Sequence, residues 1–248
     1  MKMRTQIVAG NWKMNNNTPE TELLLNNLIK YNDRDELIEK VASKISNDLA
    51  NALDSSQSVT FAVPGGSTPG PILKKLSEYK LDWKRVQVVL GDERWVPYSH
   101  ERSNTRLIKE TLFKNKASKA KFVHMYADFD TPEEGILHIN KNIDACLPLS
   151  VALLGMGADM HTASLFPGSS NLKLALSIDA PNLVAVSAPG ISERRISLTA
   201  RVLNSSKTKH LVFFGLDKKR VYDEALCLDP LSAPVLGVLD GALVHWAE

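Results

Sequence analysis

The stretch that decides the fold is residues 151–170, VALLGMGADMHTASLFPGSS. Its first four residues form a continuous apolar run, which is typical of a strand buried in a parallel sheet. Gly155 and Gly157 follow at once, and then come Asp159 and His161. Open α/β sheets bind ligands outside the carboxyl ends of their strands, where glycines let a ligand approach the backbone. We therefore expect a site at this strand end; the alternative is an ordinary turn in which His161 is solvated.

Similar apolar runs recur along the chain on both sides of this stretch. We expect further strands at 28–31, 59–63, 86–90, 122–126, 183–187 and 210–214. Helix patterns lie between them: an apolar stripe at every fourth residue from Leu37 to Leu53, a helix ending near Leu112, and one capped by Thr131. Strands that alternate with helices predict an α/β fold, with a mostly parallel sheet covered by helices on both faces in one domain.

The C-terminal third of the chain contains weaker patterns. A helix is expected to begin at Ser192 or Glu193 and to carry Arg194, Arg195 and Arg201. Residues 234–239 and 243–246 are expected to form a short strand and an end cap. The run at 210–214 would then be the last central strand.

Composition excludes several classes of protein. The chain has 248 residues, and 30 basic against 28 acidic side chains leave a net charge of +2, too little for a general nucleic-acid or membrane surface. Two cysteines without a CxxC pattern favour a reducing compartment. They predict neither a disulfide framework nor a zinc site. No apolar run is long enough to span a bilayer, and the first residues lack a signal-peptide pattern. We therefore expect a cytoplasmic protein.

A second glycine-rich turn follows the predicted strand at 59–63. Residues 64–69 read PGGSTP and lead into a helical pattern. Backbone N–H groups at Gly65 and Gly66, hydroxyls of Ser67 and Thr68, and a helix N-terminus together suit a phosphate group. The spacing matches neither a Walker A motif nor GxGxxG, so nucleotide binding is not implied. The alternative is a plain strand–helix turn in which Ser67 or Thr68 is the N-cap.

Three charged residues, Asp92, Glu93 and Arg94, come directly after the predicted strand at 86–90. Charges next to a buried strand are costly unless they are paired or functional. They therefore indicate either part of the site or a structural salt-bridge cluster.

The N-terminal segment does not fit the rest of the chain. Residues 3–26, with RTQIVAGNWKMN at Arg4–Asn15, resemble the first strand and helix of triosephosphate isomerase. Asn11 and Lys13 match that enzyme's substrate contacts. Gly190–Arg195 resembles its His-Ser-Glu-Arg-Arg stretch, but Ile191 occupies the histidine's place, and no glutamate loop is found. We expect residues 1–26 to be a leader without isomerase activity and residues 27–248 to be the functional domain.

The remaining motifs occur in the order seen in 6-phosphogluconolactonases. They are PGGSTP at 64–69, DERWVP at 92–97, ERSN at 101–104, GMGADMHTASLFPG at 155–168, RISLT at 195–199 and GLDK at 215–218. The resemblance runs from about residue 27 to the C-terminus. It implies hydrolysis of 6-phospho-D-glucono-1,5-lactone in the oxidative pentose phosphate pathway, without a metal or organic cofactor. It also implies a three-layer α/β/α sandwich with a modified Rossmann-like sheet, as in the related glucosamine-6-phosphate deaminases.

Each motif residue can be given a role on this resemblance. His161 would be the general base and Asp159 would orient its ring. The phosphate would lie on Gly65, Gly66, Ser67 and Thr68, with Arg195 and Lys218 as cations. Arg94 would polarise the lactone oxygen or bind ring hydroxyls, and Asp92 would contact sugar hydroxyls. The expected partner is a small sugar-phosphate lactone, with no nucleic acid or membrane, and the protein is expected to be a monomer or weak dimer.

One position departs from the family pattern. The family usually reads Gly-Glu-Asp-Gly-His, whereas Met160 stands before His161 here. The usual glycine can adopt a backbone conformation that Met160 reaches only at a cost, yet we expect activity to be kept. Two other functions stay open: a deaminase or isomerase on the same fold, and a non-catalytic sugar-phosphate sensor. The deaminases have a Glu-Pro pair at the position of Phe166-Pro167. They also have Asp-Glu-Tyr at the position of Asp92-Glu93-Arg94. Both differences favour the lactonase.

Overall fold

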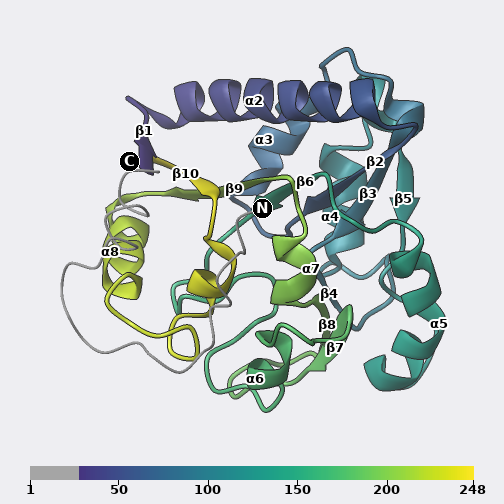
Figure 1. Cartoon of the computed structure of the whole chain (residues 1–248), viewed down its shortest axis with the longest axis vertical. Helices are drawn as coiled ribbons and strands as arrows, with labels where there is room; N and C mark the ends of the chain where they lie inside the picture. Colours follow the sequence, from purple (N-terminus) through teal and green to yellow (C-terminus); the bar gives the residue numbers. More distant parts are fainter. Residues whose placement is uncertain (1–27) are drawn as a thin grey trace, which may run out of the picture.

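A seven-stranded parallel sheet forms the centre of the computed structural model, which describes residues 28–248 (Figure 1). The leader expected at residues 1–26 lies outside the described residues. In spatial order the strands are β1 (Leu28–Lys30), β10 (Ala242–Ala247), β9 (Thr208–Phe214), β6 (Val151–Leu154), β2 (Val59–Val63), β3 (Val86–Leu90) and β5 (Lys121–Val123). Every neighbouring pair is parallel. The predicted parallel α/β sheet is confirmed.

Helices cover both faces of this sheet, as expected for three layers. The long α2 (Arg34–Ser55) crosses one face, where it packs on β2, β6 and β10, and α8 lies on the opposite face (Figure 1). The stripe from Leu37 to Leu49 is fully buried, and Asp33 caps the helix. The other helices are α3 (Pro69–Leu76), α4 (Asn104–Thr111), α5 (Pro132–Asp144), α6 (Leu172–Ala175), α7 (Ala200–Asn204) and α8 (Leu216–Ala225), with short 3-10 helices at Trp83–Arg85, Asn115–Lys119 and Pro234–Val238. Among residues 28–248, no helix has the length and hydropathy to cross a bilayer.

A second, antiparallel sheet corrects the expectation of a helix from residue 192. It consists of β4 (Asp92–Arg94), β8 (Arg195–Leu198) and β7 (Leu183–Val186) in that order. Arg195 is therefore on a strand, because β8 satisfies the backbone groups of both neighbouring strands and buries Ile196 and Leu198. A helix in its place would leave those groups unpaired.

The end of the chain also differs from the expectation. Pro234–Val238 is a 3-10 helix and not a strand. The final strand β10 is no end cap but lies between β1 and β9 in the main sheet. The reason is that β1, close to the start of the described chain, supplies a partner for its outer side.

The topology places a ligand site near the middle of the sheet. From β2 the chain proceeds to β3 and β5 on one side, and from β6 it proceeds to β9 and β10 on the other. The strand order therefore reverses between β2 and β6. Such switch points are where open α/β sheets bind ligands, beyond the carboxyl ends of the strands.

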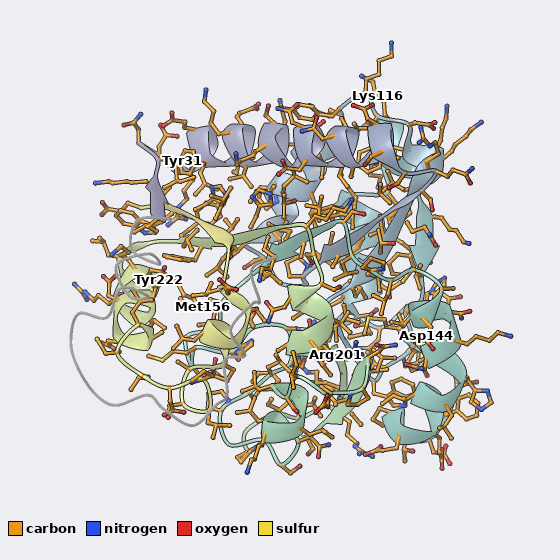
Figure 2. All side chains as sticks on the ribbon, in the orientation of Figure 1. Tyr31, Lys116, Asp144, Met156, Arg201 and Tyr222 are labelled. Atoms are coloured by element: carbon orange, nitrogen blue, oxygen red, sulfur yellow. The ribbon has the colours of Figure 1, made fainter. Side chains whose placement is uncertain are left out.

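A buried chain of hydrogen bonds links the main sheet to α2. The Tyr31 hydroxyl lies 2.8 Å from His245 Nδ1, His245 Nε2 lies 3.0 Å from His210 Nδ1, and His210 Nε2 lies 2.8 Å from Asp48. Tyr31 follows β1 beneath the start of α2 (Figure 2). Because the Asp48 carboxylate accepts, His210 donates to it and accepts from His245, which in turn accepts from Tyr31. Burial lowers the pKa of His245 to about 3, and the charge of Lys44 contributes to this.

Acid should destabilise the protein through His245. In the unfolded chain a histidine binds a proton below about pH 6.5, whereas the folded His245 does not until about pH 3. Stability from this residue is therefore lost as the pH falls below 6.5, by about 1.4 kcal/mol per pH unit. Urea unfolding at pH 6.0 and 4.5 should show a fall about 2 kcal/mol larger in the wild type than in His245→Gln. An equal fall in both proteins would contradict this assignment.

Candidate active site

A cavity of about 280 Å³ lies beyond the carboxyl ends of β2, β6 and β9 and beside the second sheet. Its lining residues are 64–69, Asp92, Arg94, Asn104, Gly155, Met156, Gly157, His161, Ala163, Arg195 and Lys218. Nine of the ten residues predicted for the site thus line one cavity. The tenth, Asp159, is bonded to His161. Residues 28–248 contain no group of three or more His, Cys, Asp or Glu arranged to hold a metal ion.

The loop at residues 64–69 joins β2 to α3 and forms one wall of the cavity. A Cβ on Gly65 would lie 1.9 Å from Asn104 Oδ1, so only glycine fits there. Gly66 has φ +91°, a conformation that glycine adopts without strain. Thr68 stands at the N-cap of α3, but its side chain makes no capping hydrogen bond. The hydroxyl is therefore available to a ligand, which favours the anion site over the plain turn.

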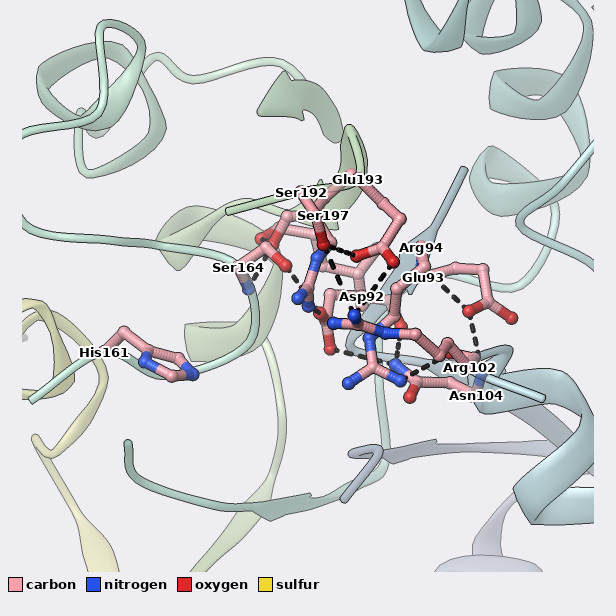
Figure 3. Close-up of polar contacts among 12 residues, drawn as sticks. Asp92, Glu93, Arg94, Arg102, Asn104, His161, Ser164, Ser192, Glu193 and Ser197 are labelled. Carbon is pink, nitrogen blue, oxygen red and sulfur yellow. Dashed lines mark hydrogen bonds and ion pairs between the residues drawn. The ribbon is translucent and has the colours of Figure 1, made fainter. Parts of the chain in front are cut away.

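His161 lies across the cavity from Asp92, Arg94 and Asn104, with its ring directed toward them (Figure 3). Its Nδ1 is hydrogen-bonded to Asp159 Oδ1. Burial raises the pKa of Asp159, but the hydrogen bond and charge of His161 outweigh it, so the pKa lies below its usual value. An ionised Asp159 accepts a hydrogen bond from the protonated Nδ1 and so fixes the tautomer, which leaves Nε2 free to take a proton from a reactant.

A tight turn between Gly157 and His161 places the histidine. The Gly157 amide donates to the His161 carbonyl at 2.8 Å, and the Met160 amide donates to the Gly157 carbonyl at 3.2 Å. Met160 has φ +64°, a left-handed backbone conformation that glycine reaches freely. For an L-residue it costs roughly 1–2 kcal/mol. The Met160 carbonyl also accepts from Val235 at 3.0 Å, and these backbone bonds hold the turn despite the strain.

Arg94 and Arg195 are direct cross-strand partners in the second sheet. Like charges in that position repel each other. Burial lowers the pKa of Arg195, with the charge of Asp92 partly offsetting this and that of Arg94 adding to it. The Nε atoms of both arginines are buried and have no partner among the described residues. An anion in the cavity would neutralise this excess of positive charge.

Asp92 faces the protein more than the cavity. Its carboxylate accepts from Ser164 Oγ at 2.5 Å and pairs with Arg195 Nη1 at 3.5 Å, and its side chain is only 8% exposed. Its carbonyl accepts from Asn104 Nδ2 at 2.8 Å. Asn104 and Ser164 were not predicted as site residues, although the ERSN motif and the opening stretch contain them. Only the folded chain shows that both hold Asp92.

Glu93 has a structural place in the charged triplet, through hydrogen bonds and not through the salt bridges of the alternative interpretation. The residue is fully buried, and its carboxylate accepts from the amides of Arg94, Asn104 and Thr105 and from the hydroxyls of Ser103 and Thr105. Burial raises its pKa, and the hydrogen bonds from Asn104 and Thr105 only partly oppose this. Glu93 thus ties β4 to the start of α4, while its two neighbours line the cavity (Figure 3).

Lys218 reaches the cavity from the first turn of α8, directly after β9. Its Nζ donates to the Met156 carbonyl at 2.8 Å. Burial lowers its pKa, and the charge of Asp159 partly offsets this. With Arg94 and Arg195 from the second sheet, Lys218 from α8 gives the cavity three cationic side chains. This arrangement favours a small anionic ligand held near a histidine.

Comparisons with known proteins agree with this description. Residues 32–246 match the family model described as glucosamine-6-phosphate isomerases/6-phosphogluconolactonase. The chain is 36% identical over 210 residues to 6-phosphogluconolactonase from Pseudomonas aeruginosa, which covers 83% of this chain and 88% of that protein. It is 34% identical over 228 residues to the one from Rhizobium meliloti, covering 89% and 98%. The crystal structure of a 6-phosphogluconolactonase from Shewanella baltica superimposes with a TM-score of 0.86 at 34% identity, over 89% of this chain and 97% of that one.

Proposed function

The chain belongs to the glucosamine-6-phosphate isomerase/6-phosphogluconolactonase family, and we propose that the cavity around His161 is its active site. The protein is an enzyme that hydrolyses 6-phospho-D-glucono-1,5-lactone to 6-phospho-D-gluconate, the second step of the oxidative pentose phosphate pathway. The main support for this site is that one cavity is lined by His161, which is hydrogen-bonded to a carboxylate, and by three cationic side chains.

In the proposed mechanism His161 acts as the general base. Its Nε2 takes a proton from a water molecule, whose oxygen attacks the lactone carbonyl carbon. The carbonyl oxygen gains negative charge, and Arg94, which lines the cavity, is proposed to stabilise it. The tetrahedral intermediate then expels the ring oxygen, which takes the proton back from Nε2. Asp159 keeps the ring oriented and stabilises the imidazolium that forms between the two proton transfers.

The remaining residues hold the phosphate. Ser67 and Thr68 at the start of α3 offer hydroxyls, and Arg195 and Lys218, which line the same cavity, offer positive charge. Fixing the phosphate end of the substrate lowers the entropic cost of bringing the carbonyl to His161. Asp92 is proposed to orient Arg195 through their ion pair, in addition to the sugar contact expected from the motif.

The rival reaction is deamination on the same fold, which Arg94 and the Phe166-Pro167 pair disfavour. A direct assay separates the two activities. We expect the enzyme to release acid from freshly generated 6-phosphogluconolactone well above the enzyme-free rate, and to release no ammonia from glucosamine 6-phosphate. Ammonia release, or binding of the lactone without turnover as in a sensor, would overturn the proposal.

The N-terminal leader provides a second test in solution. The described residues that line the cavity all lie within 64–218, so we expect that deleting residues 1–26 leaves kcat and KM for the lactone within about twofold. Steady-state kinetics of the shortened and full-length proteins would check this. A loss of tenfold or more would show that the leader contributes to the site or to the fold.

A cytoplasmic location, a monomeric or weakly dimeric state and independence of any metal or organic cofactor stay predictions of the sequence and the family. Light scattering at micromolar concentration would measure the oligomeric state. Unchanged turnover after treatment with EDTA would support the absence of a metal.

A further inference from the structure

The ring of Phe166 contacts two residues of the proposed site, His161 and Arg195, but is not among the residues that line the cavity. Its side chain is 6% exposed, and its ring centroid lies 4.3 Å from that of His161, at an interplanar angle of 46°. The guanidinium carbon of Arg195 lies 5.6 Å from the centroid of the same ring. One buried ring therefore contacts the proposed general base and a proposed phosphate-binding cation.

The local backbone explains how Phe166 meets His161. Thr162 and Leu165 form an antiparallel bridge, with the Leu165 amide donating to the Thr162 carbonyl at 2.9 Å. Ala163 has φ +48° inside this turn. The chain thus reverses between residues 161 and 166, and the two rings come together. The Ser169 amide then donates to the Phe166 carbonyl at 3.1 Å and anchors the far side of the turn.

The other contacts of His161 do not fix its position alone. Asp159 holds Nδ1, but its side chain is 53% exposed, so water competes for this hydrogen bond. Phe166 is the buried partner, and its ring covers the imidazole against rotation. Three charged groups lie near His161. They are Asp159, Lys218, whose Nζ is bonded to the Met156 carbonyl just before the turn, and Arg195, on the other side of the Phe166 ring.

Arg195 depends on the same ring. Its ion pair with Asp92 is long, at 3.5 Å, and its Nε has no partner among residues 28–248. A guanidinium over an aromatic ring is held by a cation–π attraction that strengthens where water is excluded. Arg195 is only 11% exposed, so this contact contributes to its position.

We propose that Phe166 is a positioning residue that holds His161 and Arg195 at a fixed separation, so that the enzyme favours phosphorylated lactones. This inference rests on the proposed function. A phosphate bound at Arg195 brings the carbonyl to His161 only if the distance between the two residues is right. Binding energy from the remote phosphate then accelerates the reaction at the carbonyl. If the separation varies, the phosphate still binds but no longer aligns the reacting atoms.

The test compares two lactones in the wild type, Phe166→Leu and Phe166→Tyr. The measured quantity is the preference, defined as kcat/KM for 6-phosphogluconolactone divided by kcat/KM for unphosphorylated glucono-1,5-lactone, each corrected for spontaneous hydrolysis. Phe166→Leu should lower the preference about tenfold, mainly through kcat for the phosphorylated lactone. Phe166→Tyr keeps the ring and should stay within about threefold of the wild type. Partial unfolding reduces both rates equally and leaves the preference unchanged.

A matched control lies outside the site. Phe129 is more exposed but stacks on His138 with the same centroid distance of 4.3 Å, so Phe129→Leu removes a ring contact to a histidine away from the site and should leave the preference unaltered. If Phe166→Leu does not fold, Phe166→Met replaces it with another apolar side chain without a ring. An unchanged preference in a folded variant overturns the inference while the proposed function stands. A wild type that does not hydrolyse 6-phosphogluconolactone overturns the proposed function itself.

Discussion

Replacing His161 with alanine should lower kcat for 6-phosphogluconolactone by about 100-fold or more, with a much smaller change in KM. Without the imidazole, no group bonded to Asp159 remains to take the proton from water. The cationic side chains that we propose to hold the phosphate are unchanged in this variant, so substrate binding should be kept. Rates must be measured on freshly generated lactone, with the enzyme-free rate subtracted, because lactones also hydrolyse unaided.

Two companion variants define what the loss means. Asp159→Asn keeps the imidazole but no longer fixes its tautomer, so kcat should fall by at least about tenfold. His138→Ala removes an exposed histidine from α5, outside the cavity, and should have the wild-type rate. A His161→Ala enzyme that keeps more than about half of the wild-type rate would remove the general base from the mechanism.

Gly157→Ala should be nearly as damaging although it adds only a methyl group. A Cβ at this position would lie 2.1 Å from His161 Nδ1 and 2.3 Å from Asp159 Oδ1. Atoms cannot approach so closely, so the methyl group must push the histidine and the carboxylate apart. A displacement of about 1 Å at a reacting group can cost about 100-fold in rate. We expect a folded protein with a loss of that order in kcat, measured in the same lactone assay.

Gly155→Ala is the local control for this substitution. It lies two residues earlier on the same strand exit, and a Cβ there would have no atom within 4 Å. Its effect on kcat should be less than about tenfold. Equal losses in the two variants, or a Gly157→Ala enzyme with wild-type kcat, would show that the approach to His161 and Asp159 is not what requires glycine.

Most of the main sheet could be predicted because its signals are local. The apolar runs at 59–63, 86–90, 151–154 and 210–214 are strands in the structure, and each ends in glycine or charged residues. Parallel strands bring their carboxyl ends together, so residues that follow different strands were expected to meet. His161, Lys218 and the loop at 64–69 do line one cavity for this reason.

The second sheet could not be predicted in the same way. Arg195–Leu198 alternates polar and apolar residues over only four positions, which is too short for its own sequence to choose firmly between helix and strand. The choice is made by β4 and β7, which offer unpaired backbone groups on both sides. Asp92, 103 residues before Arg195, lies on one of these neighbours.

By itself, the sequence determined the parallel sheet, the turn that carries His161 and the chemical type of each side chain in the site. These depend on hydrophobic periodicity and on glycines within a few residues of one another. Tertiary structure alone decided the pairing of Arg94 with Arg195, the support of Asp92 by Asn104 and Ser164, and the position of Phe166 against His161 and Arg195. Except for the contact between Phe166 and His161, these join segments that are distant along the chain, and their stability comes from burial and pairing that exist only after folding.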